Sequence, residues 1–246
     1  SVDYLMPTYG QVFDFISLLD KPEECVFLLT HIGGWVNPDI ESIAELCRDK
    51  GITLIEDCAH SLGATLHGKH TGLFGDAGVY SLYATKAVPA GEGGIVVTND
   101  EELFNMVDKF AIYDRFDQVL DIGINIRMSE INALLCYSVI TETEAIIANK
   151  YDIAEKYITA CDKYDWEYIN PSSNGQRSNF YKFILLSRSI SPADDFAQIK
   201  TRTSPVYDYA LGRDLAGVKD RHICLPIWYE LEDEVVDRAL SELRKS

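Results

Sequence analysis

Four short segments of the chain carry side chains that could bind a ligand. Asp57 ends an apolar run in IEDCAHS, Ser81 and Lys86 lie in GVYSLYATK, GEGG occupies 91–94, and Asn125 lies in INIRMSEINA. Together they offer a carboxylate, a hydroxyl, an amine and an amide. Each also has a structural explanation, because a strand-terminal Asp often caps a helix, a single Lys is usually solvated and GEGG is usually a turn. The secondary-structure elements that position these groups therefore decide between a binding role and the structural explanation.

Apolar runs separated by helical patterns predict a sheet in the first half of the chain. Residues 26–31 (VFLLTH) and 52–57 (ITLIED) are predicted strands, and AGVYSLY and GGIVVT are expected to form two more. Between the first two, NPD at 37–39 predicts a helix start and Gly51 its end. Another helix is predicted after NDE at 99–101. This alternation indicates βαβ units, and so an α/β fold with a mostly parallel sheet.

The predicted sheet places two candidate residues at the same edge. Asp57 and Ser81 lie at or near the carboxyl ends of their predicted strands. Open parallel sheets bind their ligands at that edge. We therefore expect a binding site there.

The second half of the chain has a different pattern. Residues 129–157 contain no Pro or Gly and are predicted to be almost continuously helical. WEYI and NFYKFILL are then expected to form antiparallel strands, and Leu231, Val235, Val236, Ala239, Leu240 and Leu243 the apolar face of a closing helix. We therefore predict a large domain at 1–142 and a smaller α+β domain at 143–246.

Composition excludes several classes of partner. The chain has 246 residues, of which 47% are hydrophobic, and a formal net charge of −17. This charge repels phosphate backbones and anionic membranes, so neither nucleic acid nor membrane is expected as a partner. The sequence shows no membrane-spanning run and no signal-peptide pattern, which predicts a cytoplasmic protein. Its six cysteines are scattered without a CxxC pair and are interpreted as reduced thiols.

No metal site is predicted. His67 and His70 have a spacing that metal ligands can show, but Gly68 and Gly72 indicate a turn there. No acid or cysteine completes a ligand set.

Three longer segments, taken in order, resemble one known family. EDCAHSLGA, GLFGDAGVYSLYATKAVPAGEGGIVVTND and GINIRMSEINALL are similar to motifs of the DegT/DnrJ/StrS family of pyridoxal-phosphate-dependent sugar aminotransferases, which belongs to the aspartate-aminotransferase superfamily of fold type I. The resemblance runs from about residue 26 to 135 and continues weakly to CLPIWYELEDEVVDRAL. It implies pyridoxal 5'-phosphate as cofactor, a nucleotide-sugar substrate, an amino-acid donor and a homodimer.

The resemblance also implies a role for each of five residues. Lys86 matches the lysine that forms a Schiff base with the cofactor and then moves protons. Asp57 matches the acid that pairs with the pyridine nitrogen and keeps the ring an electron sink. His60 matches a residue near the ring hydroxyl, and Ser81 one that contacts the phosphate. Asn125 matches a residue that reaches the phosphate of the neighbouring subunit.

The sequence departs from the family at its N-terminus. Relatives carry a longer region before the position of Val26, with a Gly-Thr turn that binds the phosphate and an aromatic that stacks on the pyridine ring. Residues 1–24 contain no such pattern, so the usual N-terminal region is expected to be lacking.

Two functional interpretations therefore stay open. The leading hypothesis is transfer of an amino group, with glutamate as the expected donor, to a keto carbon of a nucleotide-linked sugar. The alternative is a non-catalytic homologue that binds the cofactor or a sugar. A dehydratase on the same fold is disfavoured because such relatives have His in place of Lys86, and a nicotinamide-dependent reductase because the chain lacks GxGxxG. Arg202, Tyr207 and Tyr209 are candidates for the substrate pocket, or part of an ordinary loop.

Overall fold

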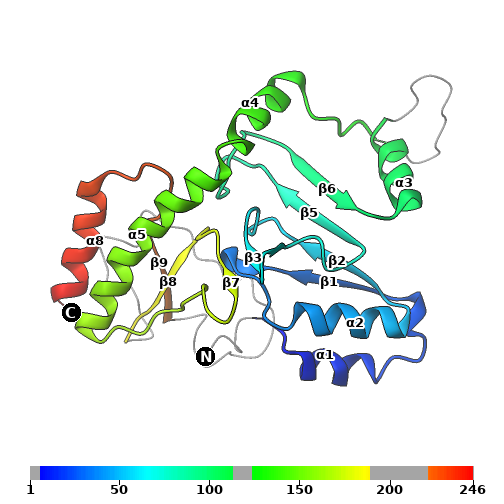
Figure 1. The fold of residues 1–246 in the computed structure, drawn as a ribbon, viewed down its shortest axis with the longest axis horizontal. Helices are drawn as coiled ribbons and strands as arrows, with labels where there is room; N and C mark the ends of the chain where they lie inside the picture. Colours follow the sequence, from blue (N-terminus) through cyan, green and yellow to red (C-terminus); the bar gives the residue numbers. More distant parts are fainter. Residues whose placement is uncertain (1–5, 113–123, 189–220, 246) are drawn as a thin grey trace.

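A four-stranded sheet forms the centre of the fold, and a smaller part made of helices and short strands lies beside it (Figure 1). The structure is a computed structural model and describes residues 6–112, 124–188 and 221–245. The central sheet has the strand order β1-β2-β5-β6, formed by Val26–Thr30, Thr53–Asp57, Ala77–Ser81 and Gly94–Thr98. The first three strands are parallel, which confirms the α/β fold with a mostly parallel sheet.

The fourth strand, β6, runs antiparallel to β5. The chain between them has no helix in it, and a parallel partner would need a crossover connection. Leu82 donates its backbone N–H to Gly93 and Ala90 donates to Leu82, which folds this connection back on itself. The GEGG segment is therefore a turn that returns the chain to the sheet.

Helices α1 (Tyr9–Ile16) and α2 (Ile40–Lys50) lie side by side on one face of this sheet (Figure 1). The start of α2 is confirmed near NPD, where the Asn37 side chain accepts the backbone N–H of Asp39 at 2.8 Å. Its end is confirmed at Gly51, which is left-handed with φ 69°. Apolar residues of the two helices and of β1 and β2 form one buried cluster: Val12, Ile16, Leu29, Ile40, Ile43 and Leu54 are among them.

The opposite face of the sheet is open among the described residues. Leu28 on β1 and Val96 on β6 have 60% and 44% of their surface exposed. The helix α3 (Glu101–Ile112) follows β6, and Asp100 caps it by accepting the N–H groups of Glu102 and Leu103. Met106 of α3 is 65% exposed.

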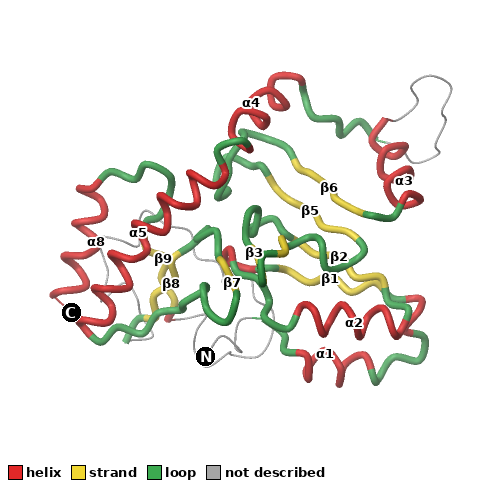
Figure 2. The backbone as a smooth tube through the Cα atoms, viewed as in Figure 1, coloured by secondary structure: helices red, strands yellow, loops and turns green. Residues whose placement is uncertain are grey.

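The helical segment after Asn125 is two helices rather than one. Ser129 caps α4 (Glu130–Ile140), and α5 (Thr143–Tyr164) begins after a break at which the axes bend by 59°. Figure 2 shows the two as separate helices. The hydroxyls of Thr141 and Thr143 donate to the carbonyls of Ser138 and Ile140, in competition with the backbone ladder. The segment is almost continuously helical, as predicted, but the prediction did not include this break.

The C-terminal part of the chain has its own core. Strands β8 (Phe183–Leu186) and β9 (His222–Leu225) pair antiparallel, and α5 packs against α8 (Asp233–Lys245). The buried cluster combines helices and strands: Tyr157, Phe180, Phe183, Leu225, Val236, Ala239 and Leu243 belong to it. WEYI pairs antiparallel with β8 as predicted, but through a single bridge between Tyr168 and Leu185 rather than a full strand.

A small sheet joins the two parts. Strand β3 (Thr65–Leu66) pairs with β4 (Lys69–His70) on one side and with β7 (Gln176–Arg177) on the other. Short 3₁₀ turns occur at Pro22–Glu24 and Ile32–Gly34. Among the described helices, none is by itself long and apolar enough to cross a membrane, and only the bent pair α4 and α5 passes such a test jointly.

Candidate functional site

Asp57 lies at the carboxyl end of β2, where the sequence predicts it. Thr30 at the end of β1 is its partner in the strand register. One carboxylate oxygen accepts the backbone N–H of Ala59 at 3.0 Å and the other accepts the Thr30 hydroxyl at 3.3 Å. These bonds hold the half-buried carboxylate in one orientation, facing away from its neighbour Glu56 because successive strand residues point to opposite faces.

Glu56, on the opposite face of the sheet, stabilises the same end of β2. Its carboxylate is fully buried and accepts the backbone N–H groups of Gly72, Phe74 and Gly75 at 2.7–2.8 Å. The Nε2 of His31 lies 2.9 Å away, and its Nδ1 accepts the N–H of Asn37, so Nε2 carries the proton and donates to Glu56. Burial alone would raise the pKa of Glu56, but these hydrogen bonds outweigh it and hold the pKa below its ordinary value.

His60 lies on the turn that follows β2. Its ring stacks on Tyr181 with centroids 4.3 Å apart, and its Nδ1 accepts the backbone N–H of Gly33 at 3.3 Å. Burial and the charge of Lys86 lower the pKa of His60 to about 4, although the Asp57 carboxylate opposes this. The imidazole is therefore neutral near pH 7, with its proton on Nε2.

Lys86 lies on the loop that follows β5 and donates its backbone N–H to Tyr83. Its side chain is half-buried, and Nζ lies 5.4 Å from the centroid of the Tyr181 ring. Burial lowers the pKa of this amine; Asp57 opposes the shift and Lys182 adds to it. A lower pKa leaves more of the amine unprotonated at neutral pH, and the unprotonated amine is the nucleophilic form.

The structure thus brings Asp57, His60 and Lys86 into one electrostatically coupled group. Ser81 ends the neighbouring strand β5, half-buried, and its hydroxyl accepts the N–H of Tyr83 at 3.3 Å. Asn125 is exposed and its described hydrogen bond is with Arg127 of its own segment, at 3.3 Å. That bond does not join Asn125 to the other four.

Tyr181 is a member of this group that the sequence analysis missed. NFYKFILL was interpreted only as a strand, whereas β8 begins at Phe183 and the preceding residues form a turn. The side chain of Asn179 accepts the backbone N–H of Tyr181 at 2.8 Å. Ser178-Asn179 before the aromatic run was the available signal, because both residues favour turns. Arg202, Tyr207 and Tyr209, the candidates for the substrate pocket, lie outside the described residues.

Two other groups of potential ligands have structural explanations. His67 and His70 are exposed on the hairpin of β3 and β4, and His67 and Gly68 have φ of 50° and 82°, as the predicted turn requires. His31, Glu56 and Cys58 have ligand atoms within 4.8 Å of one another. The hydrogen bonds described above occupy the first two, and burial raises the pKa of Cys58 to about 12, which keeps the thiol protonated.

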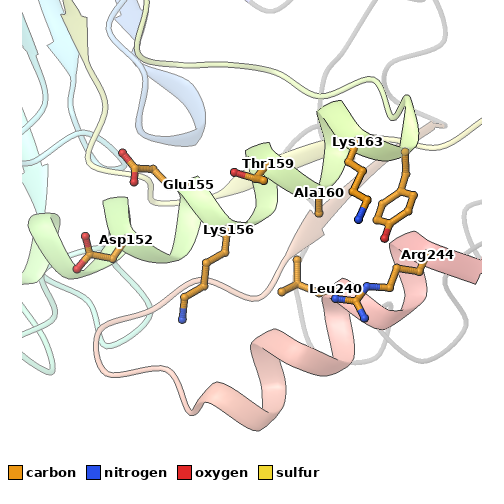
Figure 3. A pocket seen from close by; sticks show the side chains of 9 residues that line it. Asp152, Glu155, Lys156, Thr159, Ala160, Lys163, Leu240 and Arg244 are labelled. Atoms are coloured by element: carbon orange, nitrogen blue, oxygen red, sulfur yellow. The ribbon is translucent and has the colours of Figure 1, made fainter.

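A groove elsewhere on the described surface contains none of these residues. This groove of about 470 Å³ lies between α5 and α8 (Figure 3). Lys156, Thr159, Lys163, Leu240 and Arg244 are among its lining residues, and none of the five predicted site residues lines it. The groove therefore does not coincide with the group formed by Asp57, His60 and Lys86, whose side chains carry the candidate chemistry.

Comparison with known proteins gives a consistent result. Residues 21–208 match the model of the DegT/DnrJ/EryC1/StrS aminotransferase family. GDP-perosamine synthase of Escherichia coli O157:H7 is 35% identical over 124 residues, which cover 48% of this chain and 34% of the synthase. UDP-4-amino-4,6-dideoxy-N-acetyl-beta-L-altrosamine transaminase of Helicobacter pylori is 32% identical over 195 residues, which cover 72% of this chain and 52% of the transaminase.

A solved structure shows that the fold is shared. The aminotransferase TlmJ from Streptoalloteichus hindustanus superposes with a TM-score of 0.85 at 23% identity, covering 98% of this chain and 70% of TlmJ. The chain spans about half the length of the Helicobacter relative and about a third of the Escherichia one.

Proposed function

Because the chain belongs to the DegT/DnrJ/EryC1/StrS aminotransferase family, we propose that it takes part in the pyridoxal-phosphate-dependent transfer of an amino group to a keto carbon of a nucleotide-linked sugar. One observation carries the proposal. The Lys86 amine, with a lowered pKa, is electrostatically coupled to the Asp57 carboxylate and to a neutral His60 at the carboxyl edge of the parallel sheet.

The residues present fit pyridoxal phosphate by the chemistry of their donors and acceptors. Asp57 offers a fixed carboxylate for a protonated ring nitrogen, and Lys86 offers an amine for the aldehyde. His60 offers a neutral Nε2–H for the ring hydroxyl, and Ser81 a hydroxyl for the phosphate. When bound, the cofactor supplies an electron sink for the charge left by the departing proton of the amino donor.

Side chains of the protein itself would then transfer the protons. Lys86 would take up the proton at Nζ and return it, because an amine with a lowered pKa exchanges protons more readily near neutral pH. Asp57 would present its carboxylate to the ring nitrogen, in the orientation that the N–H of Ala59 and the hydroxyl of Thr30 fix. Burial and the neighbouring Lys86 would keep His60 neutral through the cycle.

The same proposal covers organisation and partners. We assign cofactor binding to residues 1–142 and a smaller α+β domain to 143–246; the start of α5 at Thr143 and the core cluster of the C-terminal part support this boundary. We propose glutamate as amino donor, a cytoplasmic location, and a homodimer in which Asn125 reaches the phosphate of the neighbouring subunit. The exposure of Asn125 is compatible with that role.

The test is covalent trapping on the purified chain. Incubation with pyridoxal phosphate and reduction with borohydride should give one modified peptide, containing Lys86, on mass spectrometry. Lys86→Ala should abolish that adduct, whereas Lys69→Ala, an exposed lysine on β4, should retain it. An unchanged adduct in Lys86→Ala would refute the assignment.

A second measurement separates binding from transfer. The chain loaded with cofactor should release about one equivalent of 2-oxoglutarate per chain when glutamate is added. An adduct at Lys86 without this release would favour the homologue that binds the cofactor without transferring an amino group.

A further inference from the structure

One side chain from the C-terminal part reaches the group formed by Asp57, His60 and Lys86. Tyr181 stacks on His60 at 4.3 Å between centroids, and both Lys86 and Lys182 place Nζ within 5.4 Å of its ring centroid. The side chain of Thr85, the residue before Lys86, lies near the Tyr181 hydroxyl. Tyr181 therefore connects the loop that carries Lys86 with the turn that carries His60.

The turn that presents Tyr181 is held against the central sheet's loops by several bonds. The backbone N–H groups of Asn179 and Lys182 donate to Gly34 and Gly33 at 3.3 and 3.2 Å. The Asn179 amide donates to the carbonyls of His60 and Leu62, each at 2.9 Å. Asn179 is fully buried, so these bonds are shielded from water. These bonds therefore fix the turn, and with it the Tyr181 ring, relative to His60.

The same turn is supported from α5. Phe180 has φ 47°, a left-handed conformation that an aromatic residue seldom adopts. Its carbonyl accepts the Nζ of Lys150 at 3.2 Å, and Lys150 is only 2% exposed. A buried amine donating to a carbonyl in this conformation stabilises the turn that places Tyr181.

We propose that Tyr181 is a positioning residue of the site, whose ring shields Lys86 and His60 from water and fixes their mutual orientation, and that Lys150 holds the turn on which Tyr181 lies. This inference rests on the proposed function for its relevance to amino transfer. Its physical content, the effect of one ring on two neighbouring ionisable groups, is independent of the cofactor.

The sign of the effect follows from the groups that surround the two residues. Asp57 from β2 and Lys182 beside the turn both face Lys86 and His60. Removing the ring leaves these charges in place and admits water. Because burial is the largest cause of both lowered pKa values, water should raise the pKa of Lys86 and of His60 toward their ordinary values.

The experiment measures those two pKa values without cofactor. Lysines are reductively methylated with ¹³C-formaldehyde and titrated by NMR, with Lys86→Arg to assign the signal, and the His60 ring proton is titrated in unmodified protein. In Tyr181→Ala both pKa values should rise. In Tyr181→Phe, which keeps the ring and loses only the hydroxyl, they should stay close to those of the unaltered chain.

A matched control is Tyr168→Ala, which removes a half-buried tyrosine stacked on Phe183 and should move neither value. Unchanged titrations in Tyr181→Ala would overturn the inference, and so would a shift in Tyr181→Phe as large as in Tyr181→Ala. If the inference fails while borohydride still traps cofactor on Lys86, the proposed function stands. If trapping fails while the pKa values move as expected, the proposed function falls alone.

Discussion

Lys150 gives the folding stability of this protein an unusual dependence on pH. Its amine is 2% exposed, and burial together with the charge of Lys182 lowers its pKa to about 7 from an ordinary 10.5. No acidic side chain among the described residues offsets this effect. Between these two values the unfolded chain binds a proton at Lys150 that the folded chain does not bind. The free energy of unfolding therefore rises with pH across that range.

The magnitude follows from the two pKa values. Each pH unit over which only the unfolded chain is protonated contributes about 1.4 kcal/mol. Between about pH 7 and about pH 8.5, partial protonation of the folded chain reduces the gain to about 1.6 kcal/mol. Below the folded pKa the gain is absent, because both states carry the proton there.

The assay is urea unfolding at the two ends of that pH range, for the unaltered chain and for Lys150→Met. The buried thiols and tyrosines titrate alike in both, so the difference between the two slopes isolates Lys150. The variant also loses the donor to Phe180, at a cost of about 1–3 kcal/mol that does not change with pH. Lys156→Met, an exposed lysine on the same helix paired with Asp233, is the control. Equal slopes in Lys150→Met and the unaltered chain would refute the reasoning.

Two further substitutions test the contacts that build the site. Gly34→Ala should destabilise the fold by roughly 3 kcal/mol or more, because Gly34 has φ 94° and a Cβ there would lie 2.7 Å from the backbone nitrogen of Tyr181; a melting temperature within experimental error of the unaltered protein would contradict this. Glu56→Gln should cost about 3–5 kcal/mol, because a buried acceptor of four hydrogen bonds loses its charge and gains unmatched donors. The lowered pKa of Glu56 means that its contribution is present above its ordinary pKa and is lost as pH falls through the folded value. Acid unfolding should therefore be less steep in Glu56→Gln, and an unchanged acid limb would argue against a charged Glu56.

Local chemistry made much of the fold predictable from the sequence. The turn at NPD, the glycine at position 51 and the alternation of apolar runs act within a few residues, and α2, β1 and β2 lie where these signals place them. The break between α4 and α5 was missed because no proline or glycine marks it. Two threonine hydroxyls compete there with the backbone hydrogen bonds of the helix.

The candidate site was predictable to a smaller extent. Asp57 and Ser81 end neighbouring parallel strands and Lys86 follows the second, so their approach is a consequence of parallel topology. Tyr181 lies more than ninety positions beyond Lys86 in the printed sequence. Its arrival depends on the pairing of β7 with β3 and on the bonds of Asn179, which no local pattern encodes.

The small sheet of β4, β3 and β7 has a mechanical consequence. It ties the C-terminal part to the loops of the central sheet close to the turn that carries Tyr181, and that turn is itself bonded to Gly33, Gly34, His60 and Leu62. Two bodies joined in this way cannot swing freely about a single flexible linker. Any opening between them has to break these hydrogen bonds and withdraw the Tyr181 ring in the same event. Access to Lys86 and loosening of the junction are therefore expected to be one cooperative motion.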